Sequence, residues 1–237
     1  MNLTGNTIFI TGGGSGIGRG LAEALQNRGN QVIISGRRKS HLKAVVKANP
    51  RMVSVELGLQ DPESIASVAK KLIAQYPKLN VLINNAGIMQ IDDVAGVVAD
   101  AVLVSTVNTN LLGSIRTTSA FIEHLKKQAA ATVIYNTSVL GSVPLAMTAV
   151  YSSTKAALHS YVLSQRHKLK NTTVGVLEIA PPWVQTDLLG SNDEPRAMPL
   201  ADSSTRPWTC WGRTHRKSWY SGKSLSATTR VLTKVHL

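Results

Sequence analysis

The chain of 237 residues has a single cysteine, few aromatic residues and half as many acidic as basic residues. Cys210 alone excludes a disulfide within the chain. The six histidines are scattered, and no Cys/His cluster has the spacing of metal ligands, so we expect no metal. No apolar run reaches the roughly 18 residues that a membrane helix needs, and no secretory signal precedes the first apolar run. We expect a soluble, cytoplasmic protein with no membrane partner.

The shortage of acidic residues leaves a formal net charge of +13. From Ser203 onward there are seven Lys or Arg and no Asp or Glu, which leaves +6 for residues 1–202. The other basic residues are spread without interleaved aromatic side chains, whereas nucleic-acid binding requires a clustered basic patch. We therefore expect no nucleic-acid partner.

Residues 1–202 alternate between apolar runs typical of buried strands and amphipathic stretches typical of helices. Strands are predicted at 7–11, 31–35, 52–56, 81–84, 132–136 and 174–179. Helices are predicted after the first strand, at 41–48, from 61 to just before Pro77, in a long stretch through 111–125, and at 151–169. At this length the alternation predicts one α/β domain of the Rossmann type, with a doubly wound parallel sheet and ligands at the carboxyl ends of its strands.

A glycine run, Thr11-Gly-Gly-Gly-Ser-Gly-Ile-Gly18, separates the first predicted strand from the first helix. Glycine lets the backbone turn sharply and lets a pyrophosphate approach the positive N-terminus of a helix. In this strand-to-helix position such a run indicates a dinucleotide site rather than a flexible turn.

The second predicted strand ends at Ser35-Gly36-Arg37-Arg38, where a free ribose 2′-hydroxyl would call for Asp or Glu. Arginine pairs bidentately with phosphate oxygens, so Arg37 and Arg38 favour NADP(H) over NAD(H). The alternative is that both are solvated loop charges.

Tyr151 and Lys155 are four residues apart on a predicted helix and therefore lie on one face. A free phenol has a pKa of about 10, and a neighbouring cation lowers it, so Tyr151 is a candidate general acid/base. Ser138 lies thirteen positions earlier, at the end of the fifth predicted strand. The three side chains together can move a proton during carbonyl/alcohol interconversion.

Five separated motifs in this order resemble the compact short-chain dehydrogenases/reductases over residues 1 to about 202. They are the glycine run, Asn84-Asn-Ala-Gly87, Asn110, Ser138 and Tyr151-Ser-Ser-Thr-Lys155. Within that family the stretches 35–38, 135–138 and 180–187 are most similar to oxidoreductases associated with D-alanine esterification, a label that says little about the substrate.

The resemblance implies a role for each matching residue. Tyr151 would protonate the substrate oxygen, Ser138 would donate a hydrogen bond to it, Lys155 would hold the nicotinamide ribose and lower the pKa of Tyr151, and Asn110 would anchor a relay water. The cofactor would be held by Gly12, Ser15, Gly16, Ile17, Gly18, Arg37, Arg38, Asn85, Ala86, Gly87, Tyr151, Lys155, Val184 and Thr186.

Several positions leave alternatives open. Asn108 competes with Asn110 for the relay role, and Asn110 could instead be a polar helix residue that bonds locally. Gly58 stands where the family usually has an Asp near the adenine. Pro181-Pro182 replaces the usual Pro-Gly, and the second proline removes a backbone donor.

The pattern changes after Asp202. Three of the four tryptophans and the only cysteine lie in residues 203–237, which show no helical or strand period and form a basic tail rich in Ser, Thr and Trp. The family has a further helix, a seventh strand and part of its oligomer contact here, so we expect that helix and strand to be missing or replaced. Loss of one base after Asp202 would explain this, because regrouped codons for 203–220 can encode a helix, a turn and a strand. A genuine basic tail that binds membrane or nucleic acid is the rival explanation.

The sequence thus predicts an NADP(H)-dependent oxidoreductase that transfers hydride between cofactor and a small carbonyl or alcohol, with Tyr151 as acid/base. The alternative is a catalytically impaired NADP-binding protein, because the altered tail removes part of the pocket wall and puts homo-oligomerisation in doubt. Epimerase or dehydratase chemistry on nucleotide sugars needs a larger substrate domain than the tail can build.

Overall fold

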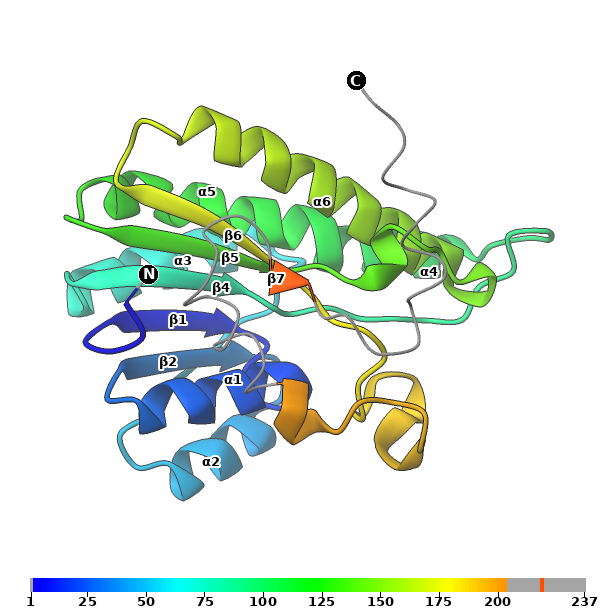
Figure 1. The fold of residues 1–237 in the computed structure, drawn as a ribbon, viewed down its shortest axis with the longest axis horizontal. Helices are drawn as coiled ribbons and strands as arrows, with labels where there is room; N and C mark the ends of the chain where they lie inside the picture. Colours follow the sequence, from blue (N-terminus) through cyan, green and yellow to red (C-terminus); the bar gives the residue numbers. More distant parts are fainter. Residues whose placement is uncertain (1, 204–217, 220–237) are drawn as a thin grey trace.

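The computed structural model describes residues 2–203 and 218–219, and its core is a parallel sheet (Figure 1). The strands are β1 (Thr7–Thr11), β2 (Gln31–Gly36), β3 (Val53–Glu56), β4 (Leu79–Asn84), β5 (Ala131–Asn136), β6 (Val174–Ala180) and β7 (Ser218–Trp219). Their order is β3-β2-β1-β4-β5-β6-β7, and every pairing is parallel. The chain reverses its winding between β1 and β4, which is where such sheets bind ligands. The predicted Rossmann-type fold is confirmed.

Helices cover both faces of the sheet (Figure 1). They are α1 (Gly16–Asn27), α2 (Lys39–Ala48), α3 (Pro62–Gln75), α4 (Asp100–Val107), α5 (Gly113–Lys126) and α6 (Ala149–Lys168). α3 begins as its sequence predicts, with Pro62 in the first turn and the Asp61 carboxylate accepting from the Glu63 amide at 2.9 Å.

The stretch predicted as one long helix is divided. A π-helical turn, η1 (Asn108–Leu112), separates α4 from α5. Single π-helical turns inside α-helices occur often at functional sites, and this one contains Asn110.

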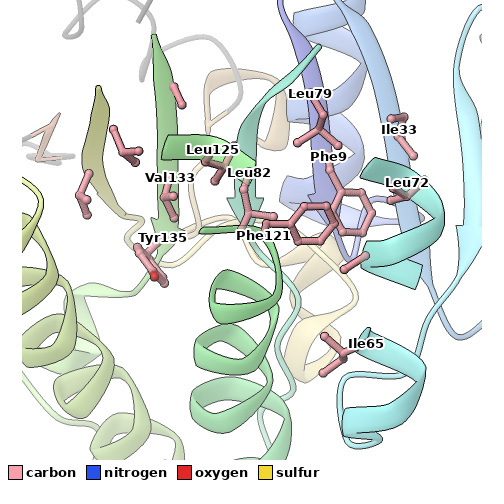
Figure 2. Packing of buried hydrophobic residues seen from close by; sticks show 14 of the residues in the cluster. Phe9, Ile33, Ile65, Leu72, Leu79, Leu82, Phe121, Leu125, Val133 and Tyr135 are labelled. Atoms are coloured by element: carbon pink, nitrogen blue, oxygen red, sulfur yellow. The ribbon is translucent and has the colours of Figure 1, made fainter. Parts of the chain in front are cut away.

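β1 shows why the sheet needs two covering layers. Phe9 packs into one hydrophobic cluster, and its ring centroid lies 5.4 Å from that of Phe121 on α5 (Figure 2). Ile8 and Ile10 point to the opposite face and pack in a second cluster with residues of α1 and α2. Successive strand residues face opposite sides, so a strand buried on both faces is apolar throughout.

At the sheet edge, β7 pairs with β6 through Ser218 opposite Ile179 and Trp219 opposite Ala180. The seventh position is therefore occupied by a two-residue strand from the tail. The predictions for residues 204–217 and 220–237 lie outside the described residues.

Candidate active site

The glycine turn after β1 is shaped by backbone that only glycine fits. Gly12 and Gly16 have positive φ angles of 68° and 51°. A Cβ atom on Gly12 would lie 2.8 Å from the Cα of Ala86, and one on Gly18 would lie 2.3 Å from Nδ2 of Asn85. The turn therefore packs directly against the segment that follows β4.

Asn85 and Thr11 hold this contact in place. Asn85 Nδ2 donates to the carbonyls of Thr11 and Gly12 at 3.0 and 3.2 Å. The Thr11 hydroxyl oxygen accepts from the amides of Asn85 and Ala86 at 3.0 and 3.2 Å. Asn85 was predicted to line the cofactor pocket, and its side chain here fixes the shape of the glycine turn.

The first turn of α1 has no side-chain cap. Ser15 precedes the helix in an extended conformation, and its side chain makes no capping bond to the first turn. Arg38 Nη2 donates to Ser15 Oγ at 3.0 Å, which brings a guanidinium to the turn. A Cβ on Gly16 would lie 3.3 Å from Cγ2 of Thr186, so the segment after β6 closes the other side. The predicted residues 15, 16, 38 and 186 are thus neighbours, and Ile17, which follows in α1, packs against the second hydrophobic cluster.

Arg37 lies towards the adjacent strand end. Its Cγ would be 3.9 Å from a Cβ on Gly58, so the departure at Gly58 leaves space beside the stem of Arg37.

Tyr151 and Lys155 are both buried on α6, with exposures of 7% and 4%. Lys155 Nζ lies 5.4 Å from the centroid of the Tyr151 ring, and the Tyr151 phenol hydrogen-bonds with Ser138. Ser138 Oγ also accepts from the Leu140 amide at 3.1 Å, which fixes the hydroxyl at the end of β5. The structure thus brings the three predicted side chains together.

The protonation states differ from the expectation. Burial raises the pKa of Tyr151 to about 12, and its hydrogen bond with Ser138 opposes this rise. The pKa of Tyr151 therefore moves in the direction opposite to the expected one, because burial disfavours the charged phenolate. Burial likewise lowers the pKa of Lys155 to about 8. Tyr151 accordingly holds its proton at neutral pH and can act as a general acid.

Lys155 is positioned from three sides. Its Nζ donates to the Asn136 carbonyl at 2.8 Å. A Cβ on Gly87 would lie 3.7 Å from Nζ, and one on Gly141 would lie 3.0 Å from the Lys155 carbonyl carbon. Asn136 was not among the predicted site residues, because its carbonyl, which any residue would supply, makes the contact.

Asn110 reaches the site from η1. Its Oδ1 accepts from the Ile88 amide at 2.8 Å, and its Nδ2 donates to the Ile88 carbonyl at 2.8 Å and to Thr154 Oγ1 at 3.3 Å. A Cβ on Gly87 would lie 3.4 Å from Oδ1. Asn110 thus joins the segment after β4 to α6. The role of Asn110 as a water anchor stays a prediction. Its hydrogen bonds favour Asn110 over Asn108 as the residue at the site.

The segment after β6 folds back on itself. Val184 forms a parallel bridge with Met198, and the amides of Gln185 and Met198 donate to the carbonyls of Met198 and Trp183. Thr186 Oγ1 accepts from the Leu188 amide at 3.3 Å. Val184 and Thr186 are both buried by the protein itself. Their contact with the cofactor stays a prediction.

Sequence reasoning also missed Asp92, whose carboxylate accepts from the amides of Ala149 and Val150 at the start of α6. No local pattern signals it, since 57 and 58 residues separate the partners.

Among the residues of the described ranges, no group of three or more His, Cys, Asp or Glu side chains is arranged to hold a metal ion. None of the helices in the same ranges combines the length and the hydrophobicity of a membrane span.

The chain is similar in sequence to known oxidoreductases. A family model described as short chain dehydrogenase matches residues 6–197. The uncharacterized oxidoreductase DltE of Bacillus subtilis (strain 168) is 40% identical over 189 residues, which cover 79% of this chain and 75% of DltE. The 3-oxoacyl-[acyl-carrier-protein] reductase FabG of Escherichia coli (strain K12) is 30% identical over 205 residues, covering 85% of this chain and 83% of FabG.

Solved structures show the same fold. A short chain dehydrogenase from Burkholderia cenocepacia J2315 in complex with NADP has a TM-score of 0.84 and 25% identity, and the match covers 98% of this chain and 97% of that one. A short chain dehydrogenase/reductase from Burkholderia phymatum in complex with NAD has a TM-score of 0.86 at 19% identity, covering 97% and 93%. The two complexes hold different nicotinamide cofactors.

Proposed function

The chain belongs to the short-chain dehydrogenase family, and from this premise we propose that it is an NADP(H)-dependent oxidoreductase that interconverts a carbonyl and an alcohol on a small substrate. The observation that carries the proposal is the group of Tyr151, Lys155 and Ser138, in which Tyr151 and Lys155 are buried on α6 and Ser138 is half-buried just after β5. The relatives' names and bound cofactors support an oxidoreductase that uses a nicotinamide.

Tyr151 is suited to deliver the proton in the reducing direction. A bound nicotinamide would supply the hydride to the carbonyl carbon. The Tyr151 hydroxyl gives its proton to the carbonyl oxygen, the C=O double bond becomes a C–O single bond, and the alcohol forms. Ser138 donates a hydrogen bond to the same oxygen as negative charge develops there. Positioned proton transfer of this kind is typically worth ~10²–10⁴-fold in rate.

The ammonium of Lys155 assists by electrostatics. It is buried, and its cation lies beside the ring of Tyr151, where it stabilises the phenolate left after proton transfer. The Asn136 carbonyl orients the ammonium, and Gly87 keeps the neighbouring space open.

The residues around the glycine turn fit a dinucleotide. A side chain at Gly12 or Gly18 would collide with the backbone and side chains that shape the turn, and the first-turn amides of α1 are left available by the side chain of Ser15. Arg38 would pair with a 2′-phosphate, with Arg37 beside it, and neither position offers a carboxylate for a free 2′-hydroxyl. This supports NADP(H) over NAD(H).

The loops above the site support an apolar, uncharged substrate. Within the described residues, eight of the twelve exposed large hydrophobic side chains lie in the segments after β4, β5 and β6. They are Ile91, Val94, Val97, Val143, Leu145, Met147, Trp183 and Leu189. Residues 88–99 and 139–148 contain no Lys or Arg, and the one Arg of residues 181–198, Arg196, is paired with Glu194 at 2.7 Å.

The test is oxidation of NADPH and of NADH, measured side by side with aliphatic, aromatic and carboxylated aldehydes and ketones. We expect turnover with NADPH and an apolar carbonyl, and loss of turnover in Tyr151→Phe. Tyr161→Phe, on the same helix, is the matched control. Full turnover by Tyr151→Phe would refute the mechanism.

The second candidate is a catalytically impaired NADP-binding protein. The observation that favours it is that residues 203–237 depart from the family pattern, and that the described part of the seventh strand is Ser218–Trp219. Binding of NADPH without its oxidation by any carbonyl tested, measured on one sample, would favour this candidate.

A further inference from the structure

Asp92 ties the segment after β4 to the start of the catalytic helix. Its carboxylate oxygens accept from the amides of Ala149 at 3.1 Å and Val150 at 2.9 Å, and its own amide donates to the Met147 carbonyl at 3.0 Å. These three bonds span residues 147–150 and end one residue before Tyr151. Asp92 is half-buried, so the contact is partly shielded from water.

The first turn of α6 lacks an ordinary local cap. Thr148, which precedes the helix, makes no side-chain capping bond to it, and the helix has no acidic residue in its first turn. The first amides of a helix need acceptors from outside, and a carboxylate there also interacts favourably with the positive end of the helix dipole. Asp92, which is 57 residues from Ala149 in the sequence, supplies both the acceptor oxygens and the negative charge.

The position of this cap bears on the chemistry. Tyr151 is the third residue of α6, so the orientation of the first turn sets where the phenol points. Ser138 lies in the loop after β5 and is fixed independently through Leu140, so a shift of the first turn changes the distance between the two hydroxyls. Lys155 is held one turn further on by Asn136 and is less affected.

We propose that Asp92 is a positioning residue for the reaction: it caps α6 from the β4 segment and so aligns Tyr151 with Ser138. The inference rests on the proposed function for its catalytic consequence. Small misplacements of a catalytic group can cost as much as about 10²-fold in rate. Cofactor binding depends on the glycine turn and Lys155, which Asp92 does not touch.

The test uses Asp92→Ala and Asp92→Asn in the full chain, with Asp93→Ala as the matched control. Asp93 lies in the same segment, is exposed, and bonds only locally through its carboxylate to the Ala95 amide. We expect kcat for NADPH-dependent carbonyl reduction to fall at least tenfold in Asp92→Ala. Asp92→Asn keeps one acceptor oxygen and should fall less. The Kd for NADPH, measured by fluorescence on the same samples, should change less than twofold in all three.

A kcat of Asp92→Ala within twofold of the wild type would overturn the proposal, and so would equal losses in kcat and NADPH affinity, which would indicate a general structural defect. Hydrogen exchange at the amides of Ala149 and Val150 gives a readout that needs no activity. Exchange there should accelerate in Asp92→Ala and not in Asp93→Ala, relative to β1 amides, and unchanged exchange refutes the cap. If the wild type binds NADPH but reduces no carbonyl, the proposed function fails and the exchange data alone decide whether Asp92 caps α6.

Discussion

The buried ammonium of Lys155 makes stability depend on pH in a predictable direction. Its pKa is lowered by burial from 10.5 to about 8. Between these two values the unfolded chain binds more protons at this site than the folded chain does, so the free energy of unfolding rises with pH. Below about pH 8 the side chain is charged in both states and the full cost of burying the charge is present. Above pH 10.5 the side chain is neutral in both states and the cost is gone.

The magnitude follows from the gap between the two pKa values. Each pH unit between them changes the free energy of unfolding by about 1.4 kcal/mol. The Lys155 site should therefore raise the free energy of unfolding of the wild type by about 3 kcal/mol between pH 8 and pH 10.5. Tyr151 acts in the opposite sense, because its pKa is raised from 10.0 to about 12. Its contribution is constant below pH 10 and is lost above it, so the measurement belongs between pH 7.5 and pH 10.

The assay is urea unfolding at several pH values for the wild type and for Lys155→Met, which keeps a similar shape without the charge. As the pH rises through this window, the free energy of unfolding of the wild type should increase by about 2–3 kcal/mol relative to that of Lys155→Met. Lys43→Met removes an exposed positive charge from α2 and controls for net charge. If the wild-type and Lys155→Met stabilities run parallel within about 0.5 kcal/mol, the ammonium is not desolvated and the reasoning is refuted.

Three further predictions concern the site. Tyr151→Phe should lower kcat by ~10²–10⁴-fold while NADPH binding, followed by fluorescence titration, is retained; a smaller loss would show that another group delivers the proton. Arg38→Ala should weaken the binding of NADPH about tenfold and leave the binding of NADH unchanged in parallel titrations. Replacement of the exposed Arg51 by Ala should alter neither affinity, and equal losses of affinity for both cofactors would contradict a 2′-phosphate contact. Gly18→Ala places a Cβ 2.3 Å from Asn85 Nδ2 and from the Gly12 carbonyl oxygen, and it should lower stability in thermal unfolding by about 1–3 kcal/mol. In the control Gly14→Ala the Cβ meets nothing closer than 3.5 Å, and stability should change by less than about 0.5 kcal/mol.

Local sequence patterns predicted most of the strands of the fold. The six apolar runs became β1 to β6 with ends displaced by no more than two residues. Strands buried on both faces are apolar throughout, whereas β3, at the edge of the sheet, is partly exposed. The division of the long helix at η1 was missed, since residues 108–112 keep helical spacing and differ only in their hydrogen bonds. The spacing of Tyr151 and Lys155 placed them on one helix face, and the glycine run was correctly placed between the first strand and the first helix.

The sequence by itself determined the sheet and the residue types of the candidate site, because periodicity, glycine turns and the spacing of side chains on one helix are local properties. Only the tertiary structure decided the protonation states and the hydrogen-bond partners of those residues. It raised the pKa of Tyr151 where its neighbour alone suggested a fall, it turned the Asn110 amide onto Ile88, and it brought Asp92 to the start of α6. Desolvation and long-range hydrogen bonds depend on which segments the fold packs together, and no local pattern records that.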